Sequence, residues 1–163
     1  CIAKNFSLLL DAFKIVRSNQ PARLIILGGG ELEESLKSQA KVNNIYNDVF
    51  FAGAVSNPEQ YFAHSSLFVL TSAYEGFGIV LAEAIAAGIP IITSDRTPIA
   101  KEMSDFYQYH RVSHDYTAEG FANKIIEQLD LLPTYEKTKI RAQAKQFTIA
   151  HSAKLYEELF VSN

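Results

Sequence analysis

The sequence predicts an α/β fold, a Rossmann-like doubly wound parallel sheet with helices on both faces. Four short apolar runs that favour β-strands alternate with segments of helical periodicity, and three of the strand-to-helix junctions contain glycine. Strands alternating with helices in this way pair in parallel through right-handed crossovers. Ligands of such sheets bind beyond the carboxyl ends of the strands. The loops of interest are therefore residues 28–30, 53–57, 71–78 and 94–98.

The first half of the chain contains two expected βα repeats. Apolar residues recur at helical spacing from Asn5 to about Asn19, and we expect Asn5 to be the N-cap. A leucine- and isoleucine-rich strand then runs into three glycines, and the helix after it has acids in its first turn and lysines later, as the helix dipole prefers. A second strand and a short helix with Pro58 in its first turn complete this half; the segments are ARLIILGGG, ELEESLKSQAKV, DVFFAG and NPEQYFAHS.

The second half continues the alternation and then becomes helical. A third strand leads to a helix closed by Gly88, and a fourth strand leads to a short helix with Pro98 near its start. An edge strand follows, and the remainder from Thr117 to Phe160 is helical. The segments are LFVLTS, FGIVLAEAIAAG, IPIITSD, TPIAKEMS and YQYHRV.

Composition favours one globular domain covering residues 1–163. Hydrophobic residues make up 48% and charged residues 20%, and no apolar run is long enough for a membrane span. The net charge of -3 gives no global positive field to hold nucleic acid or an anionic membrane. A lone cysteine, Cys1, fits a reducing, cytoplasmic location. The chain opens directly on a helical pattern without Met or a leader, so we expect it to be a piece of a longer protein.

Two glutamates stand out in the segment from Tyr74 to Asp95. Gly76 and Gly78 let the backbone approach a ligand closely, and the helix that follows offers free N–H groups to a phosphate, although a tight turn alone also uses such glycines. Glu83 lies among apolar residues that we expect to be buried on nearly every side, where a carboxylate needs a partner. That partner is either an internal ion pair or cap, or the hydroxyl groups of a bound sugar.

Other nucleotide and metal motifs are incomplete. Gly28, Gly29 and Gly30 form a phosphate-type turn, but Glu33 stands where a dinucleotide fingerprint has its third glycine, so NAD binding is disfavoured. There is no Walker lysine and no Asp-x-Asp pair, and the four histidines form no metal set. We expect His110 and His114 to be solvated. Lys4, just before the first helix, is a cation that could reach the crevice.

The order of these pieces resembles the C-terminal domain of the retaining group 1 glycosyltransferases, which have the GT-B fold. The resemblance covers nearly the whole chain. Its signature is the pair Glu75 and Glu83, which are separated by seven residues and followed by AIAAGIP. Lys4 and the glycine loop precede this pair in the sequence. The resemblance implies a cytoplasmic glycosyltransferase that binds a nucleotide-diphosphate sugar, without metal or other cofactor, and transfers the sugar with retention in bacterial polysaccharide or lipopolysaccharide synthesis.

The resemblance also implies a role for each matching position. Glu75 is the candidate catalytic residue and would meet the transferred sugar, while Glu83 would hold the ribose hydroxyls. Lys4 would neutralise the diphosphate. The remaining donor-binding positions are the glycine turn at Gly28 and Gly30, the base-bracketing Val55 and Asn57, and the turn that receives sugar and diphosphate, Gly76, Phe77, Gly78 and Ile79.

The family pattern also implies parts that this chain does not contain. An N-terminal domain would bind the glycan or lipid-linked acceptor, and the full-length protein could associate peripherally with the inner face of the membrane. The arginine partner of the lysine and the first strand of this domain would lie upstream of Cys1. Thr97-Pro98 replaces a frequent Gly-Gly, although Glu102 follows at the family's position. The alternative function is a non-catalytic, nucleotide-binding regulatory α/β module, which would have no need of Glu75.

Overall fold

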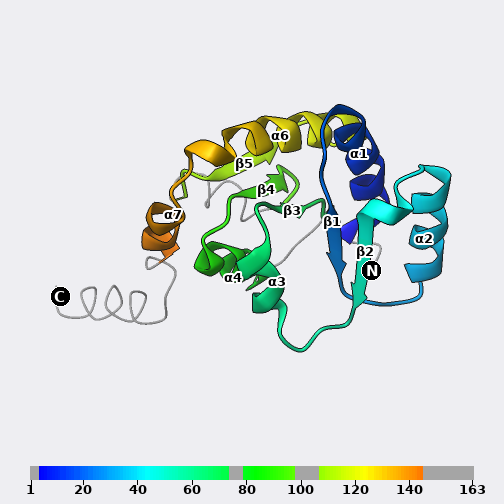
Figure 1. Cartoon of the computed structure of the whole chain (residues 1–163), viewed down its shortest axis with the longest axis horizontal. Coiled ribbons are helices and arrows are strands. Elements are labelled where there is room, and N and C mark those ends of the chain that lie inside the picture. Colours follow the sequence, from blue (N-terminus) through cyan, green and yellow to red (C-terminus); the bar gives the residue numbers. More distant parts are fainter. Residues whose placement is uncertain (1–3, 74–78, 98–106, 145–163) are drawn as a thin grey trace.

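The computed structural model describes residues 4–73, 79–97 and 107–144 and confirms the alternation of strands and helices (Figure 1). The helices are α1 (Phe6–Asn19), α2 (Glu33–Val42), α3 (Pro58–His64), α4 (Ile79–Ala87), α6 (Ala118–Leu131) and α7 (Lys137–Ala144). The strands are β1 (Leu24–Leu27), β2 (Val49–Gly53), β3 (Phe68–Leu70), β4 (Ile91–Ser94) and β5 (His110–Ser113). Short 3-10 turns span η2 (Tyr46–Asp48) and η3 (Leu132–Thr134). The helix expected in TPIAKEMS lies outside the described residues apart from Thr97.

All strand pairs are parallel, as expected, but the hydrogen bonds form two sheets rather than one. β1 pairs with β2, and β3, β4 and β5 pair in that order, which leaves β5 at an edge as the sequence predicted. Within the described residues no pairing joins β1 to β3. A cavity of about 550 Å³ lies between them instead. The sheet layer is therefore interrupted at one position.

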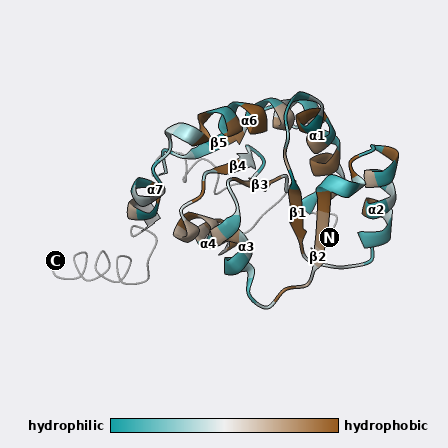
Figure 2. Ribbon diagram, in the orientation of Figure 1, coloured by the Kyte–Doolittle hydropathy of each residue, from teal (hydrophilic) through white to brown (hydrophobic). Residues whose placement is uncertain are grey.

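Helices cover both faces of the sheet layer (Figure 1). One buried cluster joins α1, α2 and α6 to the strands, and a second joins α3, α4 and α7 to them. Neighbouring residues of β4 divide between the two clusters, since Ile92 belongs to the first and Ile91 to the second. This is the alternation expected of a strand with a core on each side. Figure 2 shows hydrophobic strands in the interior, such as β1 and β2, and a largely hydrophilic α2 on the outside.

None of the helices within residues 4–73, 79–97 and 107–144 has both the length and the apolar character needed to cross a membrane.

Candidate functional site

The glycine loop after β1 has the backbone geometry that only glycine adopts readily. Gly28 and Gly30 have φ angles of 112° and 148°. The N–H of Gly28 donates to the carbonyl of Gly53 over 2.7 Å, which fixes this loop beside the one that follows β2. The two loops of interest at the carboxyl ends of β1 and β2 therefore form one surface.

The N-terminal end of α2, next to this loop, carries its own negative charge. A Cβ added at Gly29 would lie 3.6 Å from Oε2 of Glu33. Lys37 bonds both Glu33 and Glu34, at 2.8 and 2.9 Å, and these bonds raise the pKa of the Lys37 amine. Because these acids already interact favourably with the helix dipole, the end of α2 is a poor site for a further anion. A phosphate here would have to be held by the loop backbone and by cations from elsewhere.

Lys4 is placed at the carboxyl end of β3 by hydrogen bonds to its backbone. The hydroxyl of Thr71, the residue after β3, donates to the carbonyls of Lys4 and Asn5 over 2.9 and 3.1 Å. Asn5 caps α1 as predicted, with its Oδ1 accepting from the N–H of Leu8 over 3.4 Å. The ammonium group of Lys4 has no ion-pair or hydrogen-bond partner among the described residues, and the residue is half-buried. It remains available to a ligand.

Tyr116, which sequence reasoning missed, completes this connection. Its hydroxyl accepts from Nδ2 of Asn5 over 3.1 Å and donates to the carbonyl of Thr71 over 2.8 Å. Cζ of Arg96, which follows β4, lies 3.9 Å from the centre of the Tyr116 ring. The ends of β3 and β4 and the start of α1 are thus joined through one side chain. The only local signal was the position of Tyr116 directly before Thr117, the N-cap of α6.

Val55 and Asn57 lie between β2 and α3. Asn57 occupies the N-cap position of α3, and its carbonyl accepts from the N–H of Gln60 over 3.3 Å. Its side chain makes no capping hydrogen bond. Val55 is half-buried. The Asn57 amide, which is not used to cap the helix, is therefore free to bind a ligand in the segment beside the glycine loop.

The expectation that Glu83 is buried is wrong. Glu83 is exposed on α4, together with Ala82 and Ala86, whereas Leu81, Ala84 and Ile85 are buried. These two sets lie on opposite faces of the helix, and the small alanines on the outer face hid its amphipathic character. The structure gives Glu83 no hydrogen-bond or ion-pair partner among the described residues. Ile79 begins α4, while Glu75, Gly76, Phe77, Gly78 and the later Glu102 lie outside those residues.

The expectation of a solvated histidine pair is wrong for His110. His110 is 4% exposed and its Nε2 lies 2.8 Å from the hydroxyl of Thr93 on β4. Burial, with a smaller contribution from Arg111, lowers the pKa of His110 to about 4. His114 is exposed, as expected, and its Nδ1 lies 3.4 Å from Asp95. The part of the chain that the structure describes contains no group of three or more His, Cys, Asp or Glu side chains able to hold a metal ion.

The described site residues fall into three groups. Gly28, Gly30, Val55 and Asn57 line the joined loops after β1 and β2. Lys4 lies at the end of β3, and its neighbour Phe6 lines a small hollow together with the glycine loop. Glu83 lies on α4, the helix that follows β3. The structure therefore holds the backbone of Lys4 at the end of β3 and leaves Glu83 on an exposed face of α4.

Comparisons with known proteins agree on one family. The model of the family described as glycosyl transferases group 1 matches residues 2–145. The chain is 31% identical over 135 residues to the poly(glycerol-phosphate) alpha-glucosyltransferase of Bacillus subtilis (strain 168), a match that covers 82% of this chain and 20% of that protein. It is 29% identical over 147 residues to the N-acetylgalactosamine-N,N'-diacetylbacillosaminyl-diphospho-undecaprenol 4-alpha-N-acetylgalactosaminyltransferase of Campylobacter jejuni, covering 88% of this chain and 40% of that protein.

Solved structures show the same fold. Anabaena Alr3699/HepE in complex with UDP superposes with a TM-score of 0.82 at 21% identity, over 100% of this chain and 46% of that chain. WaaG, a glycosyltransferase involved in lipopolysaccharide biosynthesis, gives a TM-score of 0.76 at 19% identity, over 89% of this chain and 39% of that chain. The chain therefore spans less than half the length of these proteins.

Proposed function

Because the chain belongs to the glycosyl transferases group 1 family, we propose that it binds the nucleotide-diphosphate sugar donor of a transferase that retains the anomeric configuration. The family match over residues 2–145 carries this proposal, because it includes every candidate site residue from Lys4 to Glu83. The acceptor, a glycan or a lipid-linked sugar, would bind to a domain outside this chain.

Glu83 is exposed, whereas the sequence suggested that it is buried. An exposed carboxylate fits the proposed binding of the ribose hydroxyls better than a buried one. A carboxylate that accepts hydrogen bonds from ribose hydroxyls must be reachable before the nucleotide binds. Glu83 is exposed and has no protein partner among the described residues. It lies on the helix that follows β3, at whose carboxyl end Lys4 is held. Such a helix lies beside the crevice in a doubly wound fold.

In the proposed reaction, the bond between the anomeric carbon of the sugar and the diphosphate breaks, and the same carbon forms a bond to the acceptor. The transition state would resemble an oxocarbenium ion, as in other glycosyl transfer, while negative charge builds on the leaving diphosphate. Lys4 and the first N–H groups of α4, which begins at Ile79, would stabilise that charge. Glu75 would orient the sugar and offset its positive charge. The proposal assigns no metal ion or other cofactor to this step.

The names of similar proteins suggest the pathway and the first nucleotide to test. The structural neighbours include two proteins in complex with UDP, S. aureus TarM and Anabaena Alr3699/HepE, the latter in one structure together with glucose. Relatives include a poly(glycerol-phosphate) alpha-glucosyltransferase and, in Escherichia coli, an O-antigen biosynthesis glycosyltransferase. These names support our proposal that the full-length protein acts in bacterial polysaccharide or lipopolysaccharide synthesis, and we propose that it does so in the cytoplasm at the inner face of the membrane.

Titration calorimetry with UDP, GDP and ADP tests the proposal. One of these nucleotides should bind, and Glu83→Ala should weaken that binding about tenfold or more, because two charge-assisted hydrogen bonds to the ribose would be lost. Glu127→Ala, on α6, is the matched control and should leave the affinity unchanged, since Glu127 is paired with Lys124 at 2.7 Å. Absence of nucleotide binding at millimolar concentration, or an equal effect of the two variants, would disprove the ribose role.

The full-length protein separates a transferase from a regulatory module. A transferase should release UDP, GDP or ADP from the matching nucleotide sugar when acceptor is present, and Glu75→Gln should abolish this release without abolishing nucleotide binding. Nucleotide binding with no turnover of any sugar form would favour the non-catalytic module.

A further inference from the structure

Arg96 is an exposed cation that stacks on an aromatic ring instead of pairing with an acid. It lies two residues after the end of β4, and its Cζ is 3.9 Å from the centre of the Tyr116 ring. Among the residues that the structure describes, no carboxylate forms an ion pair with Arg96, and Oδ2 of the adjacent Asp95 lies 3.4 Å from Nδ1 of His114. A guanidinium that stacks by its face keeps the N–H groups in its plane free to donate to an oxyanion.

The Tyr116 ring is a firmly held support for this guanidinium. Its hydroxyl makes the two hydrogen bonds described above, which join it to the start of α1 and the end of β3. The backbone before the ring is also fixed, because the hydroxyl of Ser113 donates to the carbonyl of Asp115 over 2.8 Å. Gly120 allows this segment to pack closely against α6, since a Cβ at Gly120 would collide with the carbonyl of Asp115. Arg96 is therefore oriented before any ligand arrives.

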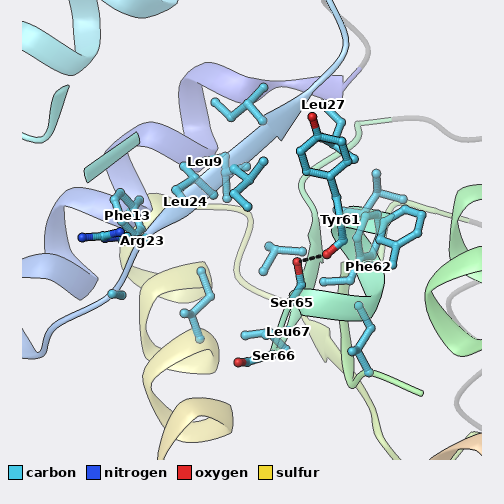
Figure 3. A pocket seen from close by; sticks show the side chains of 18 of the residues that line it. Leu9, Phe13, Arg23, Leu24, Leu27, Tyr61, Phe62, Ser65, Ser66 and Leu67 are labelled. Atoms are coloured by element: carbon cyan, nitrogen blue, oxygen red, sulfur yellow. Dashed lines mark hydrogen bonds between the residues drawn. The ribbon is translucent and has the colours of Figure 1, made fainter. Parts of the chain in front are cut away.

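The order of the strands shows where Arg96 lies along the proposed donor site. β1 and β3 line the same cavity (Figure 3), and β4 pairs with β3, so the layer runs β2, β1, β3, β4, β5 (Figure 1). In the proposed donor site the base lies at Val55 and Asn57, after β2, and the diphosphate lies at Lys4, at the end of β3. The next strand end in this direction is that of β4, which carries Arg96. Arg96 is thus placed beyond the diphosphate, where the transferred sugar and the acceptor would meet.

We propose that Arg96 is a specificity-determining residue that binds an oxyanion of the substrate beyond the diphosphate, either a carboxylate on the transferred sugar or a phosphate on the acceptor. This inference rests on the proposed donor-binding function. A carboxylate or phosphate accepts two parallel hydrogen bonds from one guanidinium, a geometry that lysine does not offer. Stacking on Tyr116 reduces the cost of ordering the long side chain when the ligand binds. Lys4, at the neighbouring strand end, adds a second positive charge to this edge.

Titration calorimetry of the full-length protein with acidic and neutral nucleotide sugars tests for a carboxylate on the sugar. The nucleotide that binds is identified first, and its glucuronate form is then compared with its glucose form. If the sugar is acidic, the wild type should bind the glucuronate form more tightly, and Arg96→Gln should weaken that binding about tenfold. The same substitution should change the affinities for the glucose form and the free nucleotide less than about twofold. Equal losses for all three ligands would overturn the proposal, because Arg96 would then contact the diphosphate or only support the fold.

A sugar phosphate tests for a phosphate on the acceptor. With the nucleotide at saturating concentration, saturation-transfer NMR compares the binding of glucose 6-phosphate with that of glucose, its uncharged counterpart. If the acceptor carries the oxyanion, glucose 6-phosphate should bind more tightly than glucose, and Arg96→Gln should weaken it about tenfold. In that case neither protein should prefer the glucuronate donor. If Arg96→Gln affects neither the acidic donor nor the sugar phosphate, the proposal is overturned.

Two further variants separate a specific contact from a change of net charge. Arg96→Lys keeps the charge and lacks the planar pair of donors, so it should retain only part of the affinity for the acidic ligand. Arg23→Gln is the matched control, because Arg23 is exposed and lies beside Leu24 at the amino end of β1, at the opposite edge of the sheet (Figure 3). It should leave the affinity unchanged. An equal loss in Arg23→Gln and Arg96→Gln would contradict a contact at Arg96.

The proposed function and the role of Arg96 can fail separately. Nucleotide binding that Glu83→Ala weakens, without any preference for an oxyanion, would overturn the role of Arg96 and leave the donor-binding function intact. Absence of nucleotide binding would overturn both.

Discussion

Tyr116 connects three elements of the candidate site through a single hydroxyl group and one ring. The hydroxyl bonds Asn5 and the carbonyl of Thr71, and Thr71 in turn bonds the backbone of Lys4. The ring packs edge-on against Phe121, with centroids 6.0 Å apart. The packing role and the hydrogen-bonding role of the side chain can therefore be separated experimentally.

Tyr116→Phe should keep the ring contact and remove both hydrogen bonds. We expect a loss of about 1–2 kcal/mol in the free energy of unfolding, and a severalfold loss of nucleotide affinity because the backbone of Lys4 is held less firmly. Denaturant unfolding and calorimetry measure the two effects. Tyr135→Phe is the control, because it removes the hydrogen bond of 2.9 Å that the Tyr135 hydroxyl donates to Gln128, outside the candidate site. This substitution should lower stability and leave the nucleotide affinity unchanged. Equal affinity losses would show that Tyr116 has no positioning role.

At single residues, the sequence predicted those features that depend on local backbone geometry. Gly28 and Gly30 were identified because a strand-to-helix turn demands φ angles that other residues avoid, and Asn5 because a cap needs a short acceptor. The exposure of Glu83 and the burial of His110 were predicted wrongly. The exposure of each side chain depends on which helices and strands pack against it. The residues adjacent in sequence do not determine that packing.

Among the elements, α4 illustrates how a helix end is fixed by a distant residue. Gly88 follows α4 with a φ angle of 76°, and its N–H donates to the carbonyl of Ile85 over 2.9 Å. Nε of Arg141, on α7, donates to the carbonyl of Ala87 over 3.3 Å. The end of the helix that carries Glu83 is therefore held both by a glycine turn and by a cation from another helix.

Gly88→Ala should destabilise the protein by about 1–2 kcal/mol or more, because alanine is strained at this φ angle. The new Cβ would also lie 2.5 Å from Cγ of Arg141. Urea unfolding measures the change. Arg141→Ala combined with Gly88→Ala should relieve the contact and leave the backbone strain. Gly29→Ala, where the nearest atoms would lie 3.6 Å away, is the matched control and should cost much less. A smaller effect at Gly88 than at Gly29 would contradict this account.

The existence and order of the elements were predictable because their signals are local. Helical periodicity, Pro58 at the first turn of α3 and the glycine after α4 each act within a few residues. Strand pairing was harder to predict from the sequence. A parallel sheet is held by residues distant in sequence, so the division into β1–β2 and β3–β4–β5 became visible only in the structure.

For the whole molecule, the prediction of a parallel α/β fold is confirmed, although the described strands form two hydrogen-bonded sheets rather than one. The surroundings of Lys4 were not predicted, because Tyr116, Thr71 and Arg96 follow three different strands and meet only after folding. The loops that the sequence singled out follow the strands at the carboxyl edge of a parallel sheet, where ligands of such sheets bind, and their role as a donor site stays a prediction.

The stability of the whole fold should depend on pH through His110. Its pKa is about 4 in the folded protein and 6.5 in an exposed state, because burial beside Thr93 disfavours the charged ring. Above about pH 7.5 the ring is almost entirely neutral in both states and adds little pH dependence. As pH falls from 6.5 to 4, the unfolded chain binds a proton that the folded protein does not, so the free energy of unfolding decreases, by about 3 kcal/mol at most.

Denaturant unfolding measures this contribution when the free energy of unfolding of the wild type and of His110→Gln is plotted against pH from 7.5 to 4. The carboxylates change the free energy of both proteins with pH in the same way, so the difference between the two curves isolates His110. The variant is less stable at pH 7.5 if the hydrogen bond to Thr93 is weakened, but its curve should be flatter between pH 6.5 and 4. Parallel curves for the wild type and His110→Gln would show that the buried ring does not control the acid stability of the fold.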